Sequence, residues 1–265
     1  MRDFLLSLLC LILLPACSTV WQEPENWQPP EHPDPEEILN SIHDDVVAKR
    51  YQTALAKHVW FFDNALHYKP ELYGVRLLNG LREWAELAKI YPPARVKLKE
   101  ARDKALKQVH EGEDVWPAFQ DLTSLNHHLD EDTLTKDTFL LLHQQNPTAA
   151  RTVFQLAQPA LVKAGEYTVC GQYLEPESFY QNILEIRHAE LRLSQTPQSS
   201  PNTLMFSDKR FTSDVGILVA LLVVNDRADE AHKIANQARQ EWDNADFHKA
   251  LDSALTGKVP PLWPN

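Results

Sequence analysis

Residues 214–238 read DVGILVALLVVNDRADEAHKIANQA, and this stretch decides the fold class. The ten residues after Asp214 are nearly all apolar, and periodicity alone does not distinguish a buried helix from a buried strand in so short a run. A turn at Asn225-Asp226 leads directly into a segment with a helical apolar stripe at Ala231, Ile234, Ala235, Ala238 and Trp242. We therefore predict a helical hairpin whose first helix is capped by Asp214 and buried on all sides.

The rest of the chain after Glu36 also has helical periodicity. Glycine is scarce, at seven residues, and long alternations of apolar and polar residues are missing. Apolar stripes with a period of about 3.6 residues occur at Leu77, Leu81, Trp84 and Ala88, and at Ala150, Val153, Phe154, Ala157 and Leu161. We predict an all-α fold in which eleven or twelve helices form antiparallel pairs stacked as an α-solenoid, over residues 36–265.

Prolines and glycines divide these helices, and one connection differs from the others. We expect helix boundaries at Pro70, Pro92-Pro93, Gly112, Asn146-Pro147, Gly165 and Pro176. Residues 194–209 are polar and of low complexity, which predicts a flexible loop. This loop is either a binding loop or lid, or an inserted surface loop.

Part of the chain resembles tetratricopeptide repeats. The long apolar helix, the tight polar turn and the small residues at Ala231 and Ala238 resemble the second half of such a repeat. Phe62, Ala65 and Pro70 match the closing half of another. The stretches 58–67, 72–77 and 84–94 are also similar to a group of uncharacterised bacterial proteins with tetratricopeptide-like architecture. This resemblance implies the fold and no activity.

The N-terminal residues resemble a bacterial lipoprotein signal. The apolar run from Phe4 to Leu14 is too short to span a membrane, and Leu14-Pro15-Ala16-Cys17-Ser18 is similar to the lipoprotein processing box. The resemblance implies removal of residues 1–16, a diacylated Cys17, and transfer to the outer membrane, since Ser18 rather than Asp follows. The alternatives are a secretory signal cleaved after Ala16 and an uncleaved anchor.

Residues 17–35 are expected to form a tether between this lipid and the helical domain. Five prolines in residues 18–35 prevent a helix, and an extended chain of this length reaches up to ~55 Å. Trp21 and Trp27 interrupt its polarity. Either tryptophan could rest at the lipid headgroups or dock on the domain, and we favour docking for Trp27.

Charge and cysteine content limit the classes of partner. The net charge of −11 opposes nucleic-acid binding and flat adsorption to anionic lipid, so membrane attachment depends on Cys17. Cys10 leaves with the signal and Cys17 takes the lipid, so Cys170 is the one remaining thiol and no disulfide forms within the mature chain. Its apolar surroundings predict a buried, unreactive side chain.

No catalytic or cofactor motif occurs, and the histidines do not form a zinc pattern. His127-His128 beside three acidic residues is a solvated helix end, because adjacent histidines point in different directions. A ligand groove is predicted between residues 51–68 and 71–90. Its candidate residues are His58, Asp63, His67, Tyr73, Arg76 and Trp84. Alternatively, they form a core-facing aromatic stripe with a hydrogen-bonded histidine.

These observations predict a non-enzymatic scaffold without cofactor or metal. It would be lipid-anchored in the bacterial cell envelope, face the periplasm, and bind a protein or peptide on a concave face. The alternative is a helical-repeat enzyme or small-ligand receptor acting on cell-envelope material. A structural spacer within an envelope assembly is a third possibility.

Overall fold

The computed structural model describes residues 27–196 and 199–263, and these residues form an all-α fold. They contain no strand, and they contain twelve helices when the continuous segment from α3 to α4 is counted once. Within each unit, most neighbouring helices in the chain pack against one another, as expected for helical repeats. The chain divides into two compact units between Pro70 and Glu71. The predicted signal, Cys17 and Trp21 lie outside the described residues.

The first unit contains α1 (Pro35–Val47) and α2 (Tyr51–Tyr68), joined by a tight turn. Asp34 caps α1 by accepting a hydrogen bond from the Glu36 backbone N–H at 2.9 Å. Asp45 is buried on α1 and forms an ion pair with Lys57 of α2 at 2.5 Å. This ion pair joins the two helices.

Trp27 packs on the first unit, as predicted. Its ring meets that of Trp60 edge to face, with 6.3 Å between the centroids. The Lys57 ammonium lies 6.0 Å from the centroid of the Trp27 ring. The chain before α1 is therefore held against α2 from Trp27 onward.

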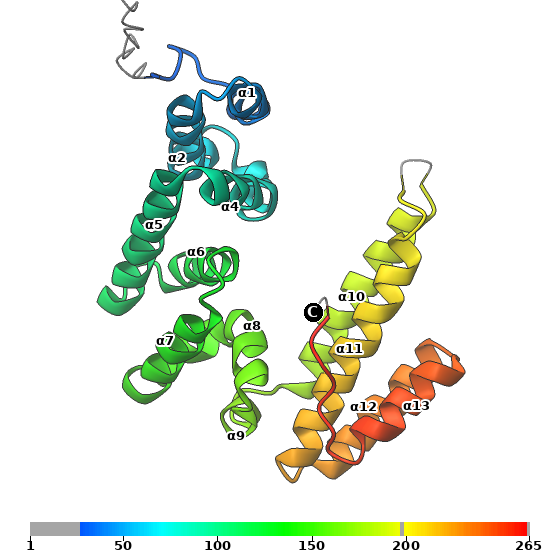
Figure 1. Ribbon diagram of the computed structural model, residues 1–265. Helices are drawn as coiled ribbons and strands as arrows, with labels where there is room; N and C mark the ends of the chain where they lie inside the picture. The colour runs from blue at the N-terminus through cyan, green and yellow to red at the C-terminus, as the bar shows by residue number, and fades with distance from the viewer. Residues whose placement is uncertain (1–26, 197–198, 264–265) are drawn as a thin grey trace, which may run out of the picture. The chain divides into compact units, whose positions relative to one another are not determined.

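The second unit begins with helices that follow the predicted boundaries (Figure 1). Pro70–Leu72 forms the 3-10 helix η1 at the junction between the units. The next helices are α3 (Tyr73–Val75), the π-helical η2 (Arg76–Gly80), α4 (Leu81–Ile90), α5 (Pro92–Glu111), α6 (Val115–His128), α7 (Asp132–Gln145), α8 (Pro147–Ala164) and α9 (Tyr167–Gly171). Gly112 and Gly165 end α5 and α8 with left-handed backbones, at φ of 75° and 77°.

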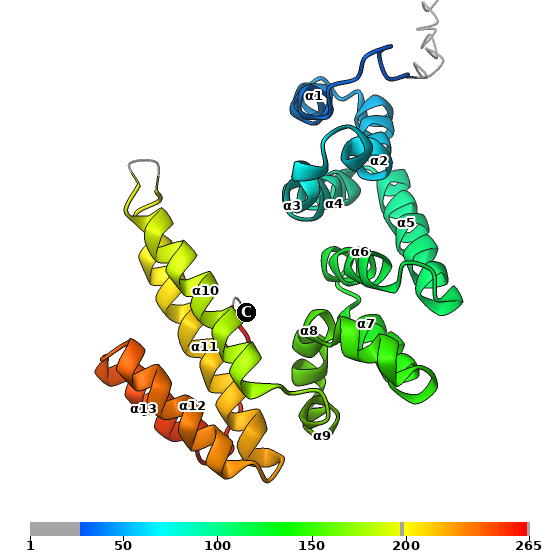
Figure 2. The ribbon, with the colours of Figure 1, turned by 180° about the vertical axis from the view of Figure 1, so that it is seen from behind.

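The second unit ends with α10 (Pro176–Ser194), α11 (Thr203–Val224), α12 (Ala228–Glu241) and α13 (Ala245–Ala254). α10, α12 and α13 all pack against α11 (Figure 2). Every residue of α11 from Val215 to Leu222 is buried, which confirms the prediction of an enclosed helix. Ala231 and Ala238 of α12 are fully buried, and their small side chains allow close packing.

Two sequence predictions for this region were wrong. α11 begins at Thr203, so the connection predicted over 194–209 is limited to residues 195–202. Asp214 therefore lies inside α11 and does not cap a helix. Tertiary packing makes this segment helical, because Ser207 and Phe211 are buried. The Arg187 guanidinium carbon lies 4.4 Å from the centroid of the Phe211 ring.

The apolar run of α11 raises the question of membrane insertion. Across the part of the chain that the structure describes, no helix combines the length and apolar content that a membrane span requires.

Candidate functional site

The three candidate groove residues of the first unit have different surroundings. His58 is buried within α2 at 2% exposure, and burial lowers the pKa of its imidazole to about 3. Asp63 and His67 are exposed on the same helix. His58 is therefore neutral at pH 7 and part of the interior, while the other two side chains face solvent.

The three candidates of the second unit lie close to α6 or in the core. Tyr73 donates a hydrogen bond to Gln120 Oε1 at 2.5 Å. The Arg76 guanidinium binds the Asp121 carboxylate through two nitrogens, at 3.0 and 2.8 Å. Trp84 is 2% exposed. Arg76 is thus engaged in a mostly buried ion pair.

The predicted groove draws its six residues from both units, three from each. Within the second unit, Tyr73 and Arg76 are turned toward α6. The groove itself stays a prediction, and the structure describes a better-defined hollow elsewhere.

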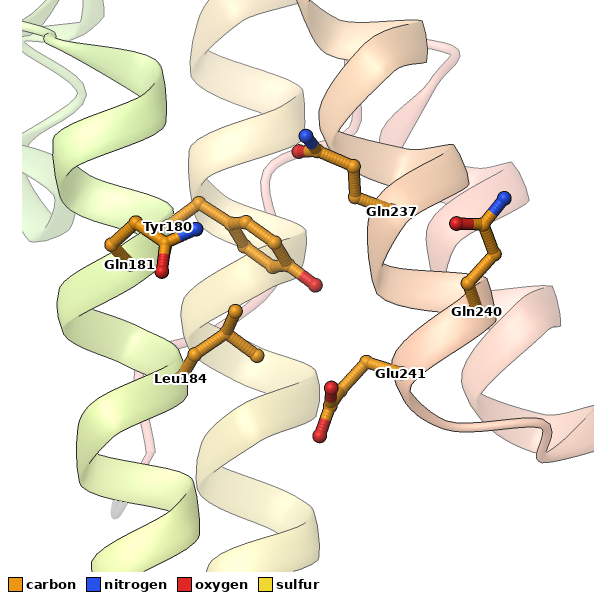
Figure 3. A pocket seen from close by; sticks show the side chains of 6 residues that line it. All are labelled: Tyr180, Gln181, Leu184, Gln237, Gln240 and Glu241. Atoms are coloured by element: carbon orange, nitrogen blue, oxygen red, sulfur yellow. The ribbon is translucent and has the colours of Figure 1, made fainter.

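This hollow lies between α10 and α12, with α11 behind both, and holds about 300 Å³ (Figure 3). Six side chains line it: Tyr180, Gln181 and Leu184 from α10, and Gln237, Gln240 and Glu241 from α12. We call it the α10–α12 groove. Its lining combines one aromatic and one aliphatic side chain with three amides and a carboxylate.

Tyr180 supplies a hydrogen-bond donor in this groove. Its hydroxyl points toward α12, between Gln237 and Glu241 (Figure 3). Burial of the side chain, followed by the negative charge of Glu241, raises the pKa of Tyr180 to about 12. The phenol therefore keeps its proton at every physiological pH.

Gln237 supplies an acceptor on the opposite helix. Its Nε2 donates to Glu177 Oε2 at 3.5 Å, whereas its Oε1 is buried and has no hydrogen-bond partner among the described residues. A buried acceptor without a donor costs about 1–3 kcal/mol. A ligand or water that donates to this oxygen recovers that free energy.

An ion pair and a histidine–carboxylate hydrogen bond between α10 and α12 flank the groove. Lys233 Nζ lies 2.7 Å from Glu177 Oε1, and His188 Nε2 lies 2.7 Å from Glu241 Oε1. Both carboxylates therefore have a basic partner on the facing helix. The centre of the groove then offers an uncharged donor and acceptor, which suits an amide group better than an ion.

A second hollow of about 210 Å³ lies between α7 and α8, beside Asp132 and Lys163. These two side chains bind each other at 2.9 Å. The Asp132 and Lys163 charges neutralise each other, and both side chains are solvent-accessible. This hollow therefore provides fewer unsatisfied groups for a ligand than the α10–α12 groove does.

Histidine and cysteine side chains were also candidates for chemistry. No group of three or more His, Cys, Asp or Glu residues in the described ranges could hold a metal ion. His127 is exposed at the end of α6, next to His128. Cys170 is fully buried, as predicted, and burial raises the pKa of its thiol to about 12.

The α10–α12 groove was missed by the sequence prediction. Tyr180 and Gln237 lie on separate helices with the whole of α11 between them in the chain. The one available signal was that Gln237 and Gln240 lie next to the apolar stripe of α12, whose buried residues include Ile234, Ala235 and Ala238.

Searches of protein-family models, curated proteins and solved structures found no match to this chain.

Proposed function

We propose that this chain is a lipid-anchored, periplasm-facing helical-repeat protein that binds a peptide segment of a partner protein in the α10–α12 groove. One observation carries the choice of site: the Tyr180 hydroxyl points toward α12, and Gln237 Oε1 on that helix is a buried acceptor without a hydrogen-bond partner among the described residues. The two carboxylates beside them, Glu177 and Glu241, each already contact a basic side chain.

A peptide group matches this arrangement because it presents one N–H and one C=O. Tyr180 donates to the carbonyl, and Gln237 Oε1 accepts from the N–H. Each such hydrogen bond contributes about 1 kcal/mol, so two bonds give weak binding by themselves. Leu184 supplies an apolar contact next to them.

The anchor is part of the same proposal. Cys17 carries a diacylglycerol in the bacterial envelope, most simply in the outer membrane, and the nine residues 18–26 separate the lipid from Trp27. Mass spectrometry of the membrane fraction should find a mature N-terminus at Cys17 with this modification. An unmodified N-terminus would remove the anchor from the proposal and leave the groove unaffected.

The groove is tested with peptides selected from a random display library against the full chain. Gln237→Leu removes the acceptor and keeps the side-chain volume, and should weaken the selected peptide about fivefold or more. Gln155→Leu makes the same chemical change at an exposed position of α8 and should leave the affinity unchanged. Equal affinities for both variants would refute the proposed site.

The alternative is a small-ligand receptor or enzyme for cell-envelope material. An acetamido sugar also carries an amide donor and acceptor, so it is compatible with the same groove. Competition distinguishes the two: N-acetylglucosamine oligomers should not displace the selected peptide if the groove is built for polypeptide.

A further inference from the structure

Large apolar side chains are exposed where α10 ends and α11 begins. Leu193 is on the last turn of α10, and Leu204, Met205 and Phe206 are on the first turn of α11. Each is between 44% and 57% exposed. We call this region, residues 191–196 and 199–207, the hairpin tip.

The hairpin tip contains very little charge. Arg192 is its one charged residue, in a chain of which 24% is charged. Just behind it, the carboxylate of Asp208 binds Arg187 at 3.1 Å, and that of Glu190 binds Arg210 at 2.9 Å. The nearest acidic groups are therefore neutralised.

Two cationic side chains beside the apolar ones have no carboxylate partner among the described residues. Neither Arg192 nor Lys209 forms an ion pair with another described residue. Lys209 Nζ instead lies 4.6 Å from the centroid of the Trp263 ring, and that ring contacts Phe206 at 6.0 Å. Tryptophan and lysine side chains combine an apolar part with a polar end, and both are found at headgroup level where proteins meet lipid.

We propose that the hairpin tip docks on the surface of an anionic phospholipid membrane. Leu193, Leu204, Met205 and Phe206 enter the boundary between headgroups and acyl chains. Arg192 and Lys209 bind the lipid phosphates, and Trp263 lies at headgroup level. The uncharged hydroxyl and amide side chains of residues 194–196 and 199–203 hydrogen-bond among the headgroups.

Charge complementarity favours lipid as the occupant. The whole chain carries −11 and is repelled by an anionic surface, but this contact presents only cations. A protein partner would need a much larger complementary area than four side chains provide. The contact is independent of peptide binding in the α10–α12 groove and of acylation at Cys17.

The test places a cysteine at the tip of the full chain and labels it with an environment-sensitive fluorophore. Met205→Cys reports on the tip, and Asn236→Cys on an exposed face of α12 is the control. The parent chain, treated identically, gives the background from its own thiols. Vesicles of phosphatidylcholine and phosphatidylglycerol, with or without nitroxide on the acyl chains, supply the membrane.

Nitroxide lipid should quench the label at position 205 and leave the label at position 236 unquenched. Arg192→Gln should weaken binding to anionic vesicles about fivefold, from the loss of one cation. Leu204→Ser with Phe206→Ser should abolish the quenching while the circular dichroism and peptide affinity stay unchanged. A blue shift of the label at position 205 without nitroxide quenching would show that protein, and not lipid, covers the hairpin tip. No spectral change would show that the tip stays in water. Either result overturns the proposal.

Discussion

His188 Nε2 lies 2.7 Å from Glu241 Oε1, and this contact joins α10 to α12 beside the groove. The Lys233–Glu177 pair joins the same two helices elsewhere along the groove. Both pairs are partly exposed, so each contributes little to stability, about 1 kcal/mol or less. Their effect is to hold the facing side chains of the groove in position.

Glu177→Ala tests this positioning effect. The substitution removes the partner of Lys233 and also the carboxylate that holds Gln237 Nε2. The free energy of unfolding should change by less than about 1 kcal/mol, because these contacts are exposed. The selected peptide should bind several-fold more weakly, as measured by calorimetry. A large loss of stability with normal peptide affinity would show that Glu177 stabilises the fold and does not position the groove side chains.

Asp214 makes the second unit more stable in mild acid. Burial raises the pKa of its carboxyl from the usual 3.8 to about 6, and Arg210 opposes this only partly. Between these two pH values the folded chain holds a proton that the unfolded chain has lost, so stability falls as the pH rises from about 4 to 6. The side chain is one third exposed, at 33%, so we expect a loss of about 1–2 kcal/mol.

Asp214→Asn should remove that pH dependence and raise the free energy of unfolding at pH 7. Urea unfolding of the wild type and the variant at pH 4.5 and 7 measures both effects. A variant less stable than the wild type at pH 7 would show that the ionised carboxylate is needed.

His58 gives the first unit the opposite response. Its pKa is lowered by burial from 6.5 to about 3, so below pH 6.5 the unfolded chain binds a proton that the folded chain does not. Stability is therefore lost as the pH falls, by about 2 kcal/mol at pH 5. His58→Leu should flatten this dependence. Thermal unfolding of both proteins, followed by tryptophan fluorescence at several pH values, provides the measurement. If stability depended on pH equally in the wild type and in His58→Leu, the buried neutral histidine would not be the cause.

Arg76 should behave as a structural residue. Arg76→Ala leaves the Asp121 carboxylate without its bidentate partner and should lower the free energy of unfolding by about 3 kcal/mol. Arg82→Ala, at an exposed position of α4, should change it by less than about 0.5 kcal/mol. If Arg76→Ala were instead neutral for stability and lost ligand binding, the groove predicted from the sequence would regain support.

Cys170 should be unreactive while the chain is folded. Its thiol is fully buried and its pKa is raised to about 12, so almost no thiolate exists at pH 8. A maleimide reagent should modify it only in denaturant, which mass spectrometry of digests can show. Rapid modification of the native chain would reveal local opening around α9.

The helices were predictable because each carries an apolar stripe that reports which face is buried. The apolar stripe predicted for α8 is buried along its whole length, at Ala150, Val153, Phe154, Ala157 and Leu161. Prolines and glycines marked the boundaries because they act locally on the backbone.

The start of α11 and the groove depend on contacts between helices, and local signals do not contain them. Residues 203–209 are helical because Ser207 and Phe211 pack in the second unit, and a polar composition conceals this. Tyr180 and Gln237 belong to helices separated in the chain by all of α11. A stripe shows that a helix face is buried, and it does not identify the helix that covers it.

The most direct test of the central proposal follows the Gln237 side-chain amide by nuclear magnetic resonance during titration with the selected peptide. The Gln237 amide and the Tyr180 ring should shift together and saturate at the Kd measured by calorimetry. Saturable binding that moved resonances around His58, Tyr73 or Trp84 and left Gln237 unchanged would contradict the proposed site.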